Sequence, residues 1–341
     1  MRKYLLPEKG NFYKANLHCH TNLSDGKLSP AEVKELYKRL GYSIVAYTDH
    51  DILLCHNELT DKDFLALNGM EFDITEKDPG KPVFSQRRTC HFCIIAIKKD
   101  NVIAPCWNTE RYHIGNSKKY MHLVKYDETK PDYRRYYNSY CISDMMHQSR
   151  QAGYFVTYNH PTWSCEDYPQ YIEYTGMHAF EMFNGGCIKS GYDEINSRVY
   201  SDMLKSGKRI YCIGADDNHN FDPQDSPYSD SGVAFTVIKA KDLEYETVTS
   251  ALLKGDFYSS TGPEIKELYV EDNKVHIKTS PAASIRINAD TRGAQIVIAE
   301  ENQTVDSATF DILDYFKYFT LTVTDHRGNR ACTNAYFTDT L

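Results

Sequence analysis

Short apolar runs, separated by stretches of helical spacing, most constrain what the first 214 residues can fold into. After a first strand that ends near residue 20, such runs recur at residues 43–48, 64–70, 91–97, 154–158, 179–183 and 209–214, and helix-like stretches lie at 143–151 and 194–206. This alternation predicts an α/β fold with a parallel sheet covered by helices. About seven strands favour a closed or nearly closed TIM-like (β/α) barrel over an open sheet.

The sequence predicts the first helix from its capping residues. Ser29 provides an N-cap, Pro30 suits the first helical position, and Glu32 is placed to close a capping box. Apolar residues at helical spacing follow, and Gly41 ends the helix before the strand at 43–48. Residues up to 48 therefore predict one β-α-β unit.

Two regions depart from the alternation of strands and helices. A polar, aromatic and basic insertion at about 98–142 is too long for an ordinary connection, which predicts a lid or a binding loop. Beyond Thr261-Gly262-Pro263 helical spacing disappears, and alternating strands are expected at 275–278, 284–288, 295–299, 318–323 and 335–337, with a hairpin turn at 325–329. We expect a barrel domain over 1–262 and a small all-β sandwich-like domain over 263–341.

Composition narrows the possible partners. The chain has 341 residues and a net charge of −8 without a long basic run, which argues against a standing nucleic-acid partner. It has neither an apolar run of membrane-spanning length nor the apolar core of a signal peptide, so a cytoplasmic protein without a membrane partner is expected. The ten cysteines are scattered in apolar runs and are expected to be reduced, and Cys90-x-x-Cys93 is interpreted as structural.

Histidines and carboxylates follow nearly every predicted strand. His18 and His20 are one residue apart, so an extended chain turns both imidazoles to the same side. Asp25 lies in the loop that follows them, and His91 lies on a later strand. Because the carboxyl ends of barrel strands meet at one mouth, these residues should converge with those that end the other strands: His50, Glu71, His160, Asp217 and His219. The pattern predicts a site for more than one metal ion.

Strand phase separates candidate ligands from their neighbours. Asp217 and His219 share a face, whereas Asp216, Asn218 and Cys19 should point away. Asp49 fits a carboxylate behind the ligands or a helix cap, and Asp51 fits either a ligand or a carboxylate that orients an imidazole. The other seven histidines lack this placement and are expected outside the site, and Glu181 is expected to make buried hydrogen bonds.

Taken together, these motifs resemble one known family. Leu17-His18-Cys19-His20-Thr21 with Ser24-Asp25-Gly26, Thr48-Asp49-His50, Gly69-Met70-Glu71, His91, Asn159-His160-Pro161 and Asp217-x-His219 occur in order over residues 14–260. This pattern resembles the polymerase and histidinol phosphatase (PHP) superfamily of metal-dependent phosphoesterases, in its two-domain type with a C-terminal β domain. The resemblance implies a distorted seven-stranded barrel with two or three metals at its mouth, either zinc, manganese or iron.

The resemblance also implies a set of ligands for each metal. One metal would be held by His18, His20, Glu71 and Asp217. A second would be held by His91 and His160, with Glu71 bridging the two, and a third by Asp25, His50 and His219.

The chemistry expected of such a site is hydrolysis of a small phosphate ester by a metal-activated hydroxide. Glu71 would bridge the metals, and the leaving group would take its proton from His219, from a metal-bound water or from an Asp near the mouth. Arg134 and Arg135 of the insertion are predicted to grip the phosphate oxygens. The alternatives are an amidohydrolase or carboxylic esterase that uses the same metals, and a non-catalytic metal-binding module. The sequence does not indicate the leaving group or the oligomeric state.

Overall fold

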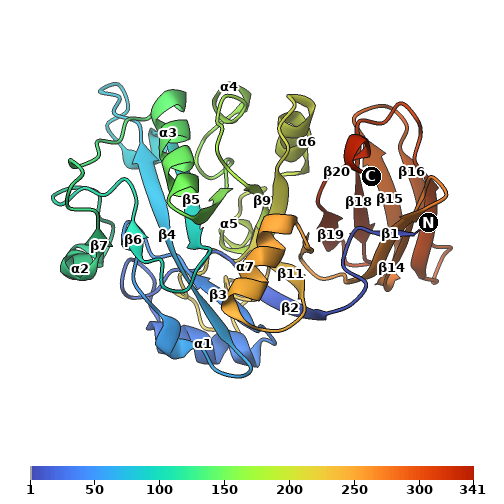
Figure 1. Ribbon diagram of the computed structural model, residues 1–341, viewed down its shortest axis with the longest axis horizontal. Coiled ribbons are helices and arrows are strands. Elements are labelled where there is room, and N and C mark those ends of the chain that lie inside the picture. Colours follow the sequence, from blue (N-terminus) through green and yellow to red (C-terminus); the bar gives the residue numbers. More distant parts are fainter. Residues whose placement is uncertain (1) are drawn as a thin grey trace.

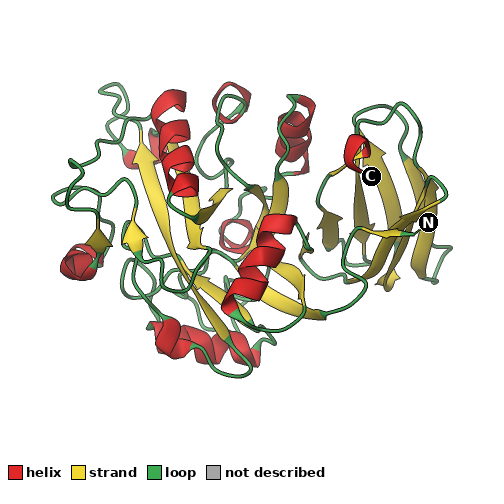
Figure 2. Cartoon of the chain, viewed as in Figure 1, coloured by secondary structure: helices red, strands yellow, loops and turns green. Residues whose placement is uncertain are grey.

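The computed structural model describes residues 2–341 and shows a mixed α/β protein built on one large sheet. This sheet has fourteen strands in the described chain. Figure 2 shows most of the helices gathered around one part of the sheet, whereas the C-terminal part consists almost entirely of strands. None of the helices in residues 2–341 combines the length and the apolar composition needed to cross a membrane.

Seven neighbouring strands carry the predicted site. In spatial order they are β10 (Tyr211–Ala215), β9 (Ala179–Asn184), β8 (Tyr154–Tyr158), β5 (Thr89–Ala96), β4 (Leu65–Thr75), β3 (Ile44–Tyr47) and β2 (Asn11–Asn16). Strands β2, β3 and β4 are parallel to one another, and so are β8, β9 and β10. Strand β5 runs antiparallel to both β4 and β8, so the prediction of an all-parallel sheet is wrong at this strand.

The two outer strands of this group approach each other at one end only. Beyond β2 and β10, a parallel bridge joins Cys19 to Asn218, and the amide of Asp217 donates to the carbonyl of His18 at 2.9 Å. The sheet itself continues from β2 into β11 (Phe235–Ala240), which is antiparallel to it. The seven strands are thus part of a large mixed sheet with helices on it, and the closed seven-stranded TIM-like barrel stays a prediction.

The interior of this part is apolar and is closed by helix α7 (Tyr245–Lys254). Ile44, Leu67 and Ile95 of three successive strands are buried in one cluster with Val248 and Leu252 of α7. Burial of such side chains contributes about 1.5–3 kcal/mol each relative to exposure. This core holds the strand ends in place above it.

The predicted start of the first helix is confirmed. In α1 (Pro30–Arg39) the Ser29 hydroxyl accepts from the amide of Glu32, and the Glu32 carboxylate accepts from the amide of Ser29 at 2.8 Å. The other helices are α2 (Ser117–Tyr120), α3 (Ser139–Gln151), α4 (Tyr168–Tyr171), α5 (Gly185–Lys189) and α6 (Ser197–Lys205), with 3-10 turns η1 (Asn57–Leu59), η2 (Phe84–Gln86), η3 (Met121–Leu123) and η4 (Thr338–Thr340).

The C-terminal part is a pair of packed sheets. The large sheet continues through β12 (Phe257–Ser260), β19 (Arg330–Thr333), β18 (Tyr318–Thr324), β15 (Ser284–Ala289) and β16 (Gln295–Ile298), with β20 (Tyr336–Phe337) paired to β18. The second sheet contains β1 (Lys3–Tyr4), β13 (Ile265–Glu271), β14 (Lys274–Ala282) and β17 (Val305–Asp311). Leu268 and Ile277 of the second sheet share one buried core with Ile287 and Leu321 of the first.

The division at residue 262 stays a prediction. The large sheet crosses this position because β12 pairs with both β11 and β19, and the N-terminal strand β1 joins β13. The insertion at 98–142 contributes β6 (Ile103–Ala104) and β7 (Lys125–Tyr126), buries Trp107 in the main core, and contacts the loop before Gly26, where the amide of Asn116 donates to the carbonyl of Ser24 at 2.6 Å.

Candidate metal centre

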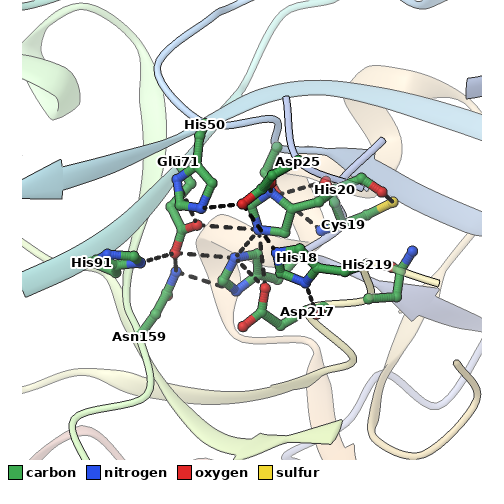
Figure 3. A network of polar contacts seen from close by, with 12 residues as sticks. His18, Cys19, His20, Asp25, His50, Glu71, His91, Asn159, Asp217 and His219 are labelled. Carbon is green, nitrogen blue, oxygen red and sulfur yellow. Dashed lines mark hydrogen bonds and ion pairs between the residues drawn. The ribbon is translucent and has the colours of Figure 1, made fainter. Parts of the chain in front are cut away.

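The predicted ligands lie together at one end of the seven strands. They surround the floor of a cavity of about 420 Å³ that Asp25, His50, Glu71, His91, His160, Asp217 and His219 help to line. His18 and His20 lie beneath it, with exposed fractions of 1% and 0%. Figure 3 shows one cluster of these side chains joined by polar contacts, among them His18, His20, Asp25, His50, Glu71, His91 and Asp217.

Glu71 lies at the centre of the group. Its Oε1 is 3.1 Å from His18 Nε2, 3.2 Å from His91 Nδ1 and 3.3 Å from His160 Nε2. Its Oε2 is 3.2 Å from His20 Nε2 and 3.3 Å from His50 Nδ1. One carboxylate thus faces five imidazoles.

His18, His20, Glu71 and Asp217 form one ligand group, whose donor atoms all lie within 4.8 Å of one another. His18 Nε2 and His20 Nε2 are 3.1 Å apart, and Asp217 Oδ1 lies 3.2 Å from the first and 3.0 Å from the second. This is the set that the family resemblance assigns to the first metal.

The structure also brings the third predicted set together and adds His20 to it. Asp25 lies 3.5 Å from His20 Nδ1, 3.7 Å from His50 Nε2 and 3.5 Å from His219 Nε2. His219 Nδ1 lies 3.0 Å from the carbonyl oxygen of Asp217. Because a carbonyl only accepts, Nδ1 of His219 is the protonated nitrogen and Nε2 is left to face Asp25.

His91 and His160 contact Glu71, and each has a further carboxylate partner. The sequence interpretation did not single out Asp73, whereas the buried hydrogen bonds expected of Glu181 are confirmed. His91 Nε2 lies 2.8 Å from Asp73 Oδ2, across the paired strands β4 and β5. Glu181 accepts from the amide of His160 at 3.1 Å and lies 3.0 Å from His18 Nδ1. Such carboxylates fix the tautomer and the orientation of an imidazole ligand. Asp73 is two residues beyond Glu71 on the same strand face, so its position was readable from the sequence.

The donor atoms fit divalent cations. Asp217 Oδ1, His20 Nδ1 and His50 Nδ1 are buried and form no well-aligned hydrogen bond with any residue in 2–341. Ligands bound at about 2.1 Å from one cation lie about 3.0–3.4 Å apart, as the nitrogen and oxygen atoms of the first group do. Imidazole and carboxylate donors together suit zinc, manganese and iron.

Backbone conformation helps to aim two of these side chains. His160 and Asp217 have φ values of 23° and 52°, in the left-handed region that residues with a Cβ rarely adopt. Strain of this kind costs on the order of 1–3 kcal/mol and is found where the surrounding structure enforces it for function. Asp51, with φ of 59°, has the same conformation next to His50.

Neighbouring charges determine the protonation of the cluster. Burial alone would raise the pKa of Glu71, but the imidazoles of His18, His91 and His50 lower this pKa well below the ordinary value. Burial lowers the pKa of His50 to about 4. Carboxylate and neutral imidazole are the forms that bind metals, and these two residues favour them near neutral pH.

The carboxylates next to His50 have other roles. Asp49 accepts from the amide and hydroxyl of Thr21, at 2.8 and 2.7 Å, and from the hydroxyl of Ser24, so it holds the turn that follows His20. Asp51 is ion-paired with Arg135, and both side chains are 2% exposed. Asp51 therefore orients no imidazole directly.

The predicted phosphate-gripping pair does not reach the cavity. Arg135 is buried on Asp51 and donates to the carbonyl of Asp73 at 3.1 Å, and its guanidinium stacks on Tyr112. Arg134 is exposed and does not line the cavity. The reason is that the desolvated carboxylate of Asp51 requires a cation, which Arg135 supplies.

A different cation and several aromatic rings line the cavity wall. Lys189, at the end of α5, is the only Lys or Arg of the described chain in this lining, and its Nζ donates to the carbonyl of Pro227 at 3.0 Å. Trp163 lies with its ring centre 5.2 Å from those of both His91 and His160. The remaining histidines lie outside the ligand groups, as predicted, and the ten cysteines are free in this structure.

Comparison with known proteins gives one family and several similar solved structures, three of which are described here. The model of the PHP domain matches residues 16–211, which is more than half of the chain. The first structure is a two-domain protein from Bacteroides vulgatus ATCC 8482 that contains a predicted PHP-like metal-dependent phosphoesterase (15% identity, 95% of this chain and 94% of that chain covered, TM-score 0.46).

The second structure is a candidate metal-dependent phosphoesterase from Bifidobacterium adolescentis ATCC 15703 (16% identity, 65% and 91% covered, TM-score 0.38). The third is an amidohydrolase from Chromobacterium violaceum with bound sulfate and no metal (18% identity, 60% and 87% covered, TM-score 0.34). No curated protein sequence matches the chain. On the match over residues 16–211, and in agreement with the histidine and carboxylate motifs that pointed to it, this chain belongs to the PHP domain family.

Proposed function

We propose that this protein hydrolyses a small phosphate ester at a site for two or three divalent cations. The observation that carries the proposal is the position of Glu71, whose two oxygens face five imidazoles of three ligand groups. A carboxylate shared in this way is expected where cations lie close together rather than at a single structural ion.

The candidate ligands divide among the cations as the family resemblance implies. His18, His20, Glu71 and Asp217 would hold one, His91 and His160 with Glu71 a second, and Asp25, His50 and His219 a third. Zinc, manganese or iron, when bound, would supply Lewis acidity to the phosphoryl group and acidify a water molecule.

The side chains at the cavity mouth have separate tasks in this proposal. Lys189 binds a non-bridging phosphate oxygen, in place of the Arg134 and Arg135 pair that the sequence suggested. His219, whose side chain is 27% exposed, is near enough to the mouth to pass a proton from Nε2 to the leaving oxygen in the two-cation form, in which Nε2 would bind no metal. Asp25 raises the pKa of His219 against the effect of burial, which favours the protonated form that this step needs.

The lysine favours phosphate esters over amides. A neutral amide needs no cation on the wall of the cavity, whereas the doubly charged phosphate of a monoester is stabilised by one. Vanadate and phosphate should inhibit the phosphoesterase, and an amidohydrolase with the same metals would be insensitive to both.

The direct test combines metal analysis with a panel of esters. Purified protein is assayed for bound metals, then for turnover of phosphomonoesters, phosphodiesters and amides with manganese, iron and zinc. We expect at least two metals per chain and turnover of a phosphate ester. Fewer than two metals and no ester turnover would contradict the proposal.

The role of Lys189 is tested separately. Replacing it by leucine should raise the KM for the best phosphate ester about tenfold and change kcat much less, because a charge-assisted hydrogen bond contributes about 1.5–3 kcal/mol. The matched control is Lys62→Leu, a lysine that is 90% exposed and outside the cavity. An unchanged KM in the Lys189→Leu variant would remove this residue from the substrate site.

A further inference from the structure

A second cavity lies between helix α6 and the C-terminal strands, away from the metal-ligand cluster. It has a volume of about 400 Å³ and is walled by α6 on one side and by β15 and β18 on the other, with contributions from β9 and β19. Figure 1 shows α6 on the side of the α/β part that faces β18 and β20. We call this cavity the interdomain cleft. It shares no lining residue with the metal cavity.

The charged side chains that line the interdomain cleft in the described residues are all positive. Its cations are Arg198, Lys205 and Arg286, and none of its lining residues in the described chain is a carboxylate. Hydroxyls and one amide complete the polar wall: Ser197, Ser201, Tyr318, Thr320, Thr322 and Asn288. A cavity of this composition favours a negatively charged ligand.

Strand register brings the polar residues of the β wall onto one face. Arg286 and Asn288 of β15 lie opposite Thr322 and Thr320 of β18. Because side chains alternate along a strand, the intervening residues Ile287 and Leu321 point to the other face, where they are buried in the C-terminal core.

Arg286 is the central feature of this wall. Its Nε is buried without a hydrogen-bond partner, and its guanidinium makes no hydrogen bond or ion pair with any residue in 2–341. In contrast, Arg135 and Arg209 each contact a carboxylate. Because a guanidinium has five N–H donors in a planar fork, an unpaired one in a cavity free of carboxylates fits a ligand with two acceptor oxygens.

Tyr318 is an independent observation at the same place. Tyr318 is 5% exposed, and its buried hydroxyl forms no well-aligned hydrogen bond with residues 2–341, although the Ser201 hydroxyl is near it. Leaving a buried hydroxyl unsatisfied costs about 1–3 kcal/mol, so natural structures pair such groups with protein, water or a ligand. Tyr318 lines the same cleft as Arg286.

We propose that the interdomain cleft binds a small organic oxyanion, either a phosphate or a carboxylate, on Arg286 and Tyr318. Lys205 and Arg198 of α6 add positive charge from the opposite wall, although Arg198 also pairs with Asp202 at 3.0 Å. The volume suits a small metabolite rather than a macromolecule. The site is separate from the proposed catalytic centre and does not depend on its metals.

Met182 provides a local reporter for the test. It lies on β9 with 3% exposure and lines the interdomain cleft, whereas its neighbour Glu181 contacts His18 in the metal cluster. The metal-loaded full chain is labelled with 13C-methyl methionine, and the Met182 resonance is assigned with Met182→Leu. Sodium phosphate and citrate are titrated separately at constant ionic strength, with chloride as the reference.

We expect a saturable shift of the Met182 resonance with phosphate, citrate or both. The anion that binds more tightly identifies the ligand as a phosphorylated or a carboxylated molecule. Arg286→Leu should weaken the response at least about tenfold and Tyr318→Phe about threefold, because one charged and one neutral hydrogen-bonding group are lost. If Arg286→Leu does not fold, Tyr318→Phe decides the question.

Two control variants locate the binding. Arg327→Leu removes an exposed arginine of the β18–β19 turn and should leave the response unchanged. Lys189→Leu alters the metal cavity and should also leave it unchanged. The proposal is wrong if neither anion shifts the resonance, or if Lys189→Leu abolishes a response that Arg286→Leu preserves, because the anion then binds in the metal cavity.

Discussion

Two buried glutamates of the α/β part lie in opposite surroundings. Glu71 is 1% exposed and faces five imidazoles, which lower its pKa well below the ordinary value. Glu166 is 7% exposed and accepts hydrogen bonds only from tyrosine hydroxyls, among them Tyr158 at 2.6 Å and Tyr137 at 2.9 Å. Burial raises the pKa of Glu166 to about 7, although these hydroxyls oppose the rise.

The difference shows that neighbours, more than burial, decide what a buried carboxylate can do. The positive charge of neighbouring imidazoles keeps Glu71 ionised, so its oxygens can accept a cation where those imidazoles give up their protons. The hydroxyls satisfy Glu166 without requiring its charge, so this carboxyl can retain a proton near neutral pH. We therefore expect Glu71 to act through metals and Glu166 through the stability of the fold.

The largest expected effect is that of Glu71→Gln. The amide keeps the shape of the side chain but loses the charge and one acceptor that the five imidazoles face, so metal content should drop and kcat/KM should fall about 10³-fold. The matched control, Glu166→Gln, should keep its metals and stay within about threefold of the wild type. Equal losses in both variants would mean that the two carboxylates do not differ as described.

Chelation of the metals should have the next largest effect. A cation that binds only the folded chain adds about 4 kcal/mol of stability at 1,000 times its dissociation constant. Dialysis against a chelator should lower the free energy of unfolding in urea by about this amount, and added metal should restore it. The free energy of unfolding of Glu71→Gln should change much less on chelation. If the urea midpoint of the wild type stays the same after its metals are shown to be lost, the metals do not stabilise the fold.

The sequence was sufficient to predict the convergence of the site. His18, His50 and Asp217 follow strands that run in the same direction, so their common edge could be inferred. His91 reached the same edge for a different reason. It lies near the start of β5, which runs antiparallel, and a buried apolar run has no sequence feature that reveals its direction.

Other parts of the structure could not be predicted, because local sequence patterns do not reveal which distant residues come into contact. Strand β17 was not predicted because Phe310 is its only buried residue. The pairing of Arg135 with Asp51 joins residues 84 positions apart, so nothing local distinguished Arg135 from a free surface cation. Helix α7 was missed although its signal was present, in the apolar stripe of Val248 and Leu252 before Gly255.

Stability should depend on pH through Glu166. Its pKa is raised from 4.5 in the unfolded chain to about 7 in the fold, so the folded state holds the proton more tightly. Its contribution is complete below pH 4.5 and is lost as pH rises toward 7, with a total change of about 3 kcal/mol. Urea unfolding of wild type and Glu166→Gln at pH 5, 6, 7 and 8 should show that the variant lacks this part of the decline. Parallel curves for the two proteins would mean that Glu166 is ionised throughout.

The smallest expected effect concerns a single tyrosine hydroxyl that donates to Glu166. Tyr137→Phe removes one donor to Glu166, and a hydrogen bond to an ionised group contributes more than one to a neutral group. We expect a loss of about 2 kcal/mol at pH 8, where Glu166 is charged, and of about 1 kcal/mol at pH 5, where it is protonated. Tyr140→Phe is the matched control, because Tyr140 is 84% exposed three residues away and should change the free energy of unfolding at neither pH. If Tyr137→Phe costs the same at both pH values, Glu166 does not change its charge between them, and the contrast with Glu71 would rest on geometry alone.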